Sequence, residues 1–262
     1  MTFTLSHRGG SGPPLLCVHG FVDTWRTWEL VLPALEERHD VLAPTLPGHA
    51  GGPAPAGSLD EVVDALEAAM DEAGFTTAHV VGNSLGGYLA LRLAVRGRAR
   101  SVVALAPAGG WADGDPLLRE THVPHFTTLQ QQSQAAAPHI DAIVRTAAGR
   151  RRVTDLITSH YEHIPAELIA HQILGVAACD AVGSMLDAAL RDGWPLDAER
   201  IACPVRIVWG TDDRILPWPS AAARYLADLP TADWVELDGV GHCPQLDVPL
   251  DTAQLVLGLT AV

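Results

Sequence analysis

The chain has 262 residues, of which 48% are hydrophobic and 18% charged, a composition that predicts one globular domain or one core domain with an insertion. Its formal net charge of −14 disfavours nucleic acid and anionic membrane surfaces as partners, so we expect a small-molecule partner. The sequence contains no Lys, which excludes a Schiff-base lysine and the phosphate-binding lysine of a P-loop.

The N-terminal residues 1–8 lack the basic stretch and apolar run of a secretory signal, and no apolar segment reaches membrane-spanning length. We therefore expect a cytoplasmic protein. The four cysteines are dispersed without a Cys-x-x-Cys pair, which predicts thiols rather than a zinc knuckle or a redox dithiol. The expectation is an enzyme with no cofactor and no bound metal.

Short apolar runs alternate with helical patterns over the first hundred residues, as in a parallel sheet covered by helices. Apolar residues recur at helical spacing over residues 59–73 and 85–95, which predicts two amphipathic helices. The strand pattern resumes late in the chain. The predicted strands are residues 2–6, 15–19, 40–43, 78–81, 101–106, 205–209 and 234–237.

The segment 111–195 differs from its flanks because helical patterns fill it, prolines interrupt it and no strand pattern is convincing. This predicts a helical cap inserted into a sheet domain. The expected fold class is therefore α/β. Residues 1–110 and 196–262 would form the core, and residues 111–195 the cap.

A Gly-Asn-Ser-Leu-Gly sequence at 82–86 joins a predicted strand to a predicted helix. This order of strand, sharp turn and helix is typical of a nucleophile elbow, which predicts that Ser84 is exposed at the N-terminus of the helix. Side chains at positions 82 and 86 would collide with neighbouring backbone, so both are Gly. Because a serine hydroxyl is a weak nucleophile, the chain must also supply an imidazole and a carboxylate.

Two loops that follow late predicted strands carry these groups. The first loop contains Asp212 and Asp213, and the second contains His242. Of the 12 histidines, His242 alone lies on a loop after a late strand beyond these acids, so we assign it as the general base. The residues alone leave Asp212 and Asp213 both open as the acid.

These motifs resemble the α/β-hydrolase superfamily over nearly the whole chain, and they look most like its capped esterase, perhydrolase and carbon–carbon-bond hydrolase branch. The resemblance implies an α/β-hydrolase fold, with a mostly parallel central sheet flanked by helices and an inserted helical cap. Besides the elbow, it rests on four ordered matches, which are His19-Gly20-Phe21, Pro47-Gly48-His49, the W-G-x-x-D-x-x-x-P pattern from Trp209 to Pro217, and Gly241-His242-Cys243-Pro244.

The resemblance also implies roles for individual residues. It favours Asp213 as the triad acid, because Asp213 has the glycine three positions before it and the proline four positions after it; Asp212 remains the alternative. It implies an oxyanion hole formed by the backbone N–H groups of Phe21 and Leu85. His19 would support the oxyanion loop without touching the substrate.

Further residues are candidates for the substrate pocket. Trp111 follows the strand after the elbow and is a candidate pocket wall. Asn83, beside the nucleophile, resembles the carbon–carbon-bond hydrolase group. Acids further along the Trp111 loop, Asp113 and Asp115, are disfavoured as the triad acid relative to Asp213.

Other polar clusters have simpler interpretations. The pairs His122/His125 and His160/His163 have the spacing of two metal ligands, but neither has an evident third ligand, so surface or pocket-lining histidines are favoured. The run 150–152 of three arginines is typical of a solvated helix end, with a clamp for a carboxylate-bearing substrate as the alternative.

The expected function is that of a serine hydrolase, which cleaves a carboxylic ester of a small, largely apolar substrate through an acyl-enzyme on Ser84. The alternatives are hydrolysis of a carbon–carbon bond in a vinylogous diketone, and a non-catalytic ligand receptor on the same fold. A serine at the elbow argues against the haloalkane dehalogenase and epoxide hydrolase branches, which place an aspartate there.

Overall fold

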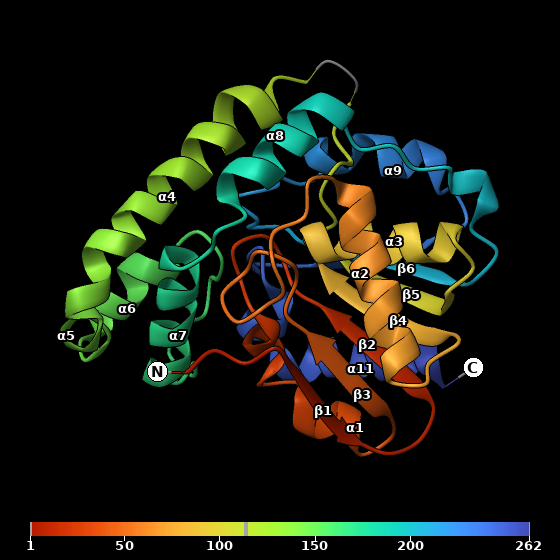
Figure 1. Cartoon of the computed structure of the whole chain (residues 1–262), viewed down its shortest axis with the longest axis horizontal. Coiled ribbons are helices and arrows are strands. Elements are labelled where there is room, and N and C mark those ends of the chain that lie inside the picture. Colours follow the sequence, from red (N-terminus) through yellow and green to blue (C-terminus); the bar gives the residue numbers. More distant parts are fainter. Residues whose placement is uncertain (1, 113–114, 262) are drawn as a thin grey trace.

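The computed structural model describes residues 2–112 and 115–261, and its centre is a seven-stranded sheet (Figure 1). The strand order is β1-β3-β2-β4-β5-β6-β7; β1 pairs with β3 antiparallel, and the other pairs are parallel. This mostly parallel sheet confirms the expected fold class. The strands are β1 (Ser6–Gly10), β2 (Pro14–Val18), β3 (Asp40–Pro44), β4 (Ala78–Asn83), β5 (Ala99–Leu105), β6 (Val205–Gly210) and β7 (Asp233–Leu237).

The first strand is shifted from its predicted position at 2–6. The alternation of Thr with apolar residues in this stretch is typical of a strand, but β1 is the Ser6–Gly10 segment, which pairs with β3 along its whole length. Arg8 and Asp40 on these two strands also form an ion pair. Phe3 instead packs against His171, with ring centroids 4.7 Å apart. Tertiary contacts thus outweigh the local pattern.

Helices cover both faces of the sheet, so that the core has two layers. Helices α2 (Leu59–Glu72) and α3 (Leu85–Val95) pack on one face, and α1 (Leu32–Glu36) and α11 (Pro249–Thr260) pack on the other. Helix α2 begins after Ser58, whose side chain accepts the Glu61 N–H and so caps the helix. Shorter elements connect these layers, namely η1 (Trp25–Trp28), η4 (Ala198–Arg200), η5 (Ser220–Ala222), α9 (Ala223–Asp228) and α10 (Pro244–Asp247).

Between β5 and β6 the described residues form helices and loops, with no strand. We call residues 117–192 the helical segment; its larger helices are α4 (Val123–Ala136), α7 (Ala166–Ala177) and α8 (Val182–Asp192), and in Figure 1 α4 to α7 lie to the left of the sheet. Shorter elements are the π-helix η2 (Leu117–His122), η3 (Ala137–His139), α5 (Ile140–Val144) and α6 (Ala147–Thr154). The division into core and cap remains a prediction, and Asp113 lies outside the described residues.

Apolar side chains connect the helical segment to the loop after β7. Leu168 and Ile169 of α7 belong to the same buried cluster as Cys243 and Leu246. Within the described ranges no single helix is long and apolar enough to cross a membrane; α7 and α8 together pass that length and composition test, although they are bent by 69° relative to each other.

The parallel arrangement determines where chemistry can take place. Strands β2, β4, β5, β6 and β7 all run in one direction, so the loops that follow them gather at one edge of the sheet. Each predicted catalytic or oxyanion residue lies just after one of these strands.

Candidate active site

The turn between β4 and α3 holds Ser84 in a strained conformation, with φ of 56° and ψ of −118°. Its N–H donates to the Leu105 carbonyl (2.8 Å), and its carbonyl accepts the Ala108 N–H (3.0 Å). A Cβ at Gly82 would overlap the carbonyl oxygen of Gly86, and a Cβ at Gly86 would overlap that of Val18. The close packing predicted for both glycines is therefore present, and it holds the turn against its strain.

His242 and Asp213 lie together on the loops after β7 and β6. The Nδ1–H of His242 donates to Asp213 Oδ2 at 2.7 Å, and both residues are buried. Asp213 Oδ1 accepts the N–H groups of Ile215 (2.9 Å) and Leu216 (2.7 Å), which locks the carboxylate in place. With Nδ1 as the donor, Nε2 of His242 is left as a proton acceptor. Asp212 is exposed.

Ser84 and His242 line one cavity. In this part of the described structure Ser84 Oγ and His242 make no hydrogen bond. Such bonds are often long in unliganded sites and tighten when the substrate binds. The structure therefore brings Ser84 and His242 to one cavity, with the Asp213–His242 hydrogen bond formed and no hydrogen bond yet between Ser84 and His242.

The two predicted oxyanion donors lie beside Ser84. Leu85 is the first residue of α3, and neither its N–H nor that of Phe21 has an acceptor among the described residues. His19 supports the Phe21 loop, because its Nδ1 donates to the Gly20 carbonyl (2.7 Å) while its Nε2 accepts the Leu46 N–H (2.9 Å). Burial, with the charge of His49 as a smaller cause, lowers the pKa of His19 well below its usual value, so this imidazole stays neutral.

Asn83 borders the cavity, but its amide is fully occupied by the protein. Its Nδ2 donates to the carbonyls of His242 (3.0 Å) and Leu105 (3.2 Å), and its Oδ1 accepts from Gln245 Nε2 (3.1 Å) and from the Cys243 thiol (3.4 Å). No donor or acceptor of the amide is left for a ligand. Asn83 thus holds the His242 loop against the elbow.

Two cavities meet at Ser84. The larger has a volume of about 480 Å³ and is lined by His242 as well as Ser84. The smaller, of about 50 Å³, has an almost wholly apolar lining that includes Trp111 and Met185. Phe21 borders both cavities and packs on Phe126 of α4, with ring centroids 4.9 Å apart.

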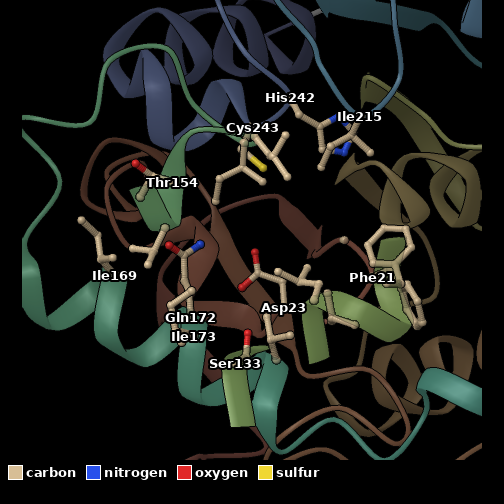
Figure 2. Close-up of a pocket in the computed structure, with 18 of the residues that line it drawn as sticks. Phe21, Asp23, Ser133, Thr154, Ile169, Gln172, Ile173, Ile215, His242 and Cys243 are labelled. Carbon is tan, nitrogen blue, oxygen red and sulfur yellow. The ribbon is translucent and has the colours of Figure 1, made fainter. Parts of the chain in front are cut away.

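The larger cavity has polar residues that the sequence analysis did not single out (Figure 2). Asp23 reaches it from the loop after β2, Ser133 from α4 and Gln172 from α7. Asp23 could have been found from its position two residues after Phe21. Gln172 gives a weaker signal, as a polar residue within an apolar helical stretch.

Three of the four histidines in the remaining predicted clusters have hydrogen-bond partners, and the fourth, His125, has none for its buried Nε2 in the described structure. His122 Nε2 donates to the Ile215 carbonyl (2.9 Å), and His163 Nε2 donates to the Leu246 carbonyl (2.7 Å). His125 lines the larger cavity, while His160 lies near the buried carboxylate of Asp247. In the residues that the structure describes, no group of three His, Cys, Asp or Glu side chains could hold a metal ion.

The three arginines of α6 have different contacts. Arg150 donates to the Val144 carbonyl, and Arg151 donates to the Ser159 carbonyl and pairs with Asp155. Arg152 is exposed and borders the larger cavity. A clamp formed by all three arginines is therefore absent from the described residues.

Comparison with known proteins matches residues 15–255 to the alpha/beta hydrolase family. The chain is 34% identical over 199 residues to an epoxide hydrolase, EphH, of Mycobacterium tuberculosis, an alignment that covers 74% of this chain and 91% of that protein. It is 30% identical over 268 residues to a pimeloyl-[acyl-carrier protein] methyl ester esterase of Aromatoleum aromaticum, covering 93% and 96%.

Among solved structures, the chain resembles a meta-cleavage product hydrolase from Pseudomonas fluorescens. The TM-score is 0.73 at 21% identity, and the match covers 98% of this chain and 93% of that one. At this identity the likeness establishes the fold.

Proposed function

The chain belongs to the alpha/beta hydrolase family and is an α/β-hydrolase enzyme, and from this premise we propose that it cleaves a carboxylic ester of a small, largely apolar substrate through an acyl-enzyme on Ser84. The observation that carries the proposal is the buried Asp213–His242 hydrogen bond, which leaves a proton-accepting Nε2 on the cavity that Ser84 lines.

The proposed mechanism has two halves. Ser84 Oγ attacks the ester carbonyl carbon while His242 Nε2 takes its proton, and Asp213 stabilises the imidazolium. The N–H groups of Phe21 and Leu85 bind the oxyanion of the tetrahedral intermediate. His242 then gives the proton to the alkoxide oxygen, the alcohol leaves, and water cleaves the acyl-enzyme by the same steps.

The two cavities suggest how such a substrate is divided. The alcohol oxygen must meet His242 to take up its proton, and His242 borders only the larger cavity of the two. We therefore assign the alcohol portion to the larger cavity and the acyl portion to the smaller one. The smaller cavity has room for a short alkyl chain beside Trp111.

Carbon–carbon-bond hydrolysis of a vinylogous diketone is the second candidate, supported by the resemblance of the fold to a meta-cleavage product hydrolase. The occupied amide of Asn83 weakens it, because that residue has no polar atom left to orient such a substrate.

Epoxide opening, suggested by the name of one relative, suits a carboxylate nucleophile better than Ser84. Attack of a carboxylate on an epoxide carbon gives an ester, which water can cleave. Attack of a serine hydroxyl would give an ether, which has no carbonyl for water to attack and would block the enzyme.

The proposal is tested with an active-site label and a substrate panel. A fluorophosphonate is expected to label Ser84 stoichiometrically, and Ser84→Ala is expected to lower kcat for p-nitrophenyl acetate by about 10⁴-fold or more. Ser184→Ala in α8, outside both cavities, serves as the matched control.

The same panel includes a vinylogous diketone and styrene oxide. Unchanged turnover by Ser84→Ala would overturn the mechanism. Absence of both label and turnover would favour the ligand receptor, and preferential cleavage of the diketone would favour the second candidate.

A further inference from the structure

Asp23 lies in the oxyanion loop, yet its carboxyl group faces the larger cavity (Figure 2). The preceding residue, Val22, has a positive φ of 59°, which is rare for a β-branched side chain and is typical of backbone held in place at a functional site. Asp23 Oδ1 accepts the Thr24 N–H at 2.8 Å, next to the start of η1. One carboxylate oxygen therefore has a structural role, and the carboxyl group also lines the larger cavity, beside the side chains of Thr27 and Gln172.

Two further polar side chains approach the same region. Gln172 is 6% exposed, and its Oε1 is buried without a hydrogen-bond partner among the described residues. Ser133 is 3% exposed and lines the same cavity. We call Asp23, Ser133 and Gln172 the polar patch. Because unpaired buried polar groups are costly, such a patch is typical of a site completed by a ligand.

The charge of Asp23 is not neutralised by a neighbour. The titratable groups around the larger cavity are His125, Arg152, His242 and Cys243, and none of them forms an ion pair with Asp23 in the described structure. Burial raises the pKa of Asp23 to about 6, against the opposing effects of the Thr24 N–H and the nearby Thr27 and Gln172 side chains. At neutral pH the carboxylate is thus largely ionised and accepts hydrogen bonds.

We propose that the polar patch binds a hydrogen-bond donor, either a hydroxyl or a protonated amine, on the alcohol portion of the substrate, and that Asp23 excludes alcohol portions that carry an anion. This inference rests on the proposed function, because it takes the larger cavity as the place of the alcohol. It makes Asp23 a specificity-determining residue, whereas the triad carries the chemistry.

The experiment compares acetate esters whose alcohol chains run from propyl to hexyl and end in methyl, hydroxyl, ammonium or sulfonate. At one chain length the hydroxyl or ammonium ester is expected to exceed the methyl ester in kcat/KM by about fivefold or more. The acetate ester whose alcohol chain ends in sulfonate is expected to have a kcat/KM about tenfold or more below that of the methyl-ended ester. The hydroxyl and ammonium arms decide which donor the patch prefers.

Substitutions test whether these differences in kcat/KM arise from the polar patch. Asp23→Asn keeps an oxygen for the Thr24 N–H and is expected to raise the sulfonate-to-methyl ratio about tenfold. Gln172→Met is expected to lower the hydroxyl-to-methyl ratio while leaving the rejection of sulfonate intact. Asp180→Asn removes the same charge at an exposed position outside the cavity and is expected to change neither ratio. Ratios that stay the same in Asp23→Asn at every chain length would overturn the proposal.

The pH dependence gives a readout that a merely structural role of Asp23 would not produce. A carboxyl group with a raised pKa of about 6 is ionised above that pH and neutral below it. Sulfonate remains charged throughout, so its rejection is expected to weaken several-fold between about pH 7.5 and about pH 5. The Asp23→Asn protein should show no such change in the ratio.

A binding measurement separates this inference from the proposed function. In the Ser84→Ala background, alkanediols and alkylammonium ions are expected to raise Tm more than alkanols of equal length, and Asp23→Asn is expected to abolish the difference. If esters are not cleaved but this difference is present, the proposed function fails and the polar patch stands. If esters are cleaved and neither the kcat/KM ratios nor the Tm shifts depend on Asp23, the proposal for the polar patch is overturned while the proposed function stands.

Discussion

The side chains assigned to the chemistry and the cavity wall opposite them differ in how completely their polar groups are paired. On the side of the sheet, Asp213 and Asn83 have their side-chain oxygens bonded to the protein, and the ring of His19 is bonded through both nitrogens. On the side of the helical segment, Gln172 Oε1 has no partner in the described structure, and Arg152 stands exposed. The groups assigned to the chemistry are thus fixed by folding, whereas the wall opposite them is left for a ligand to complete.

The largest effect is expected from breaking the paired side. In Asp213→Asn the amide oxygen can still accept the Ile215 and Leu216 N–H groups, but the NH₂ then faces His242 Nδ1 and forces the wrong tautomer. We expect kcat for p-nitrophenyl acetate to fall about 10³- to 10⁴-fold with little change in Tm. Asp212→Asn is the matched control, and an equal loss in that variant would contradict the assignment of Asp213.

A second prediction concerns the connection between the two sides. Asp247 is buried, and its carboxylate accepts the N–H groups of Gly241 (2.6 Å), beside His242, and of Ser159 (2.9 Å) and His160 (2.5 Å) in the helical segment. Asp247→Ala leaves three backbone donors without this acceptor and is expected to lower the free energy of unfolding by about 3 kcal/mol.

Urea denaturation measures this loss. Asp238→Ala, an exposed residue of the loop after β7, is expected to change the free energy of unfolding by less than about 0.5 kcal/mol. A similar small change in Asp247→Ala would mean that the two sides are not held together at this carboxylate.

The smallest effect is expected from Met185, through which the helical segment borders the smaller cavity. Met185 of α8 lines the smaller cavity, and Met185→Ala would lengthen it. The kcat/KM ratio of hexanoyl to acetyl esters is expected to rise about tenfold, because each methylene in an apolar pocket has a modest effect. Met70→Ala removes a buried methionine of α2 away from both cavities, and it should destabilise the protein without moving this ratio. A shift in both variants would contradict our assignment of the acyl portion.

Much of the fold could be predicted because buried parallel strands leave continuous apolar runs. From β2 onward, each predicted strand lies within two residues of the observed boundaries. The strand predicted at 2–6 was misplaced, because the partner that fixes the position of an edge strand is remote in sequence. The loops that carry Ser84, Asp213 and His242 follow directly from those strands, so their convergence at one edge was predictable from parallel topology.

The polar patch could not be predicted in the same way. Ser133 and Gln172 come from two helices, and no local pattern determines which faces of α4 and α7 meet a cavity that starts at β2. Asn83 shows the same limit. Its position beside the nucleophile was evident, whereas the direction of its amide depends on His242 and Gln245, which lie about 160 residues away.

The hydrogen bonds that run from Asn83 through Gln245 to Thr27 also bear on how this enzyme could be rebuilt. All three residues lie outside the helical segment, but the histidine loop also depends on that segment, because the Cys243 N–H donates to the Ile157 carbonyl at 2.9 Å. A different set of helices could be grafted between β5 and β6, provided that the graft offers Asp247 new backbone donors and the Cys243 N–H a new acceptor. The substrate range could then be changed by exchanging one segment of the chain, with the proposed catalytic residues left unaltered.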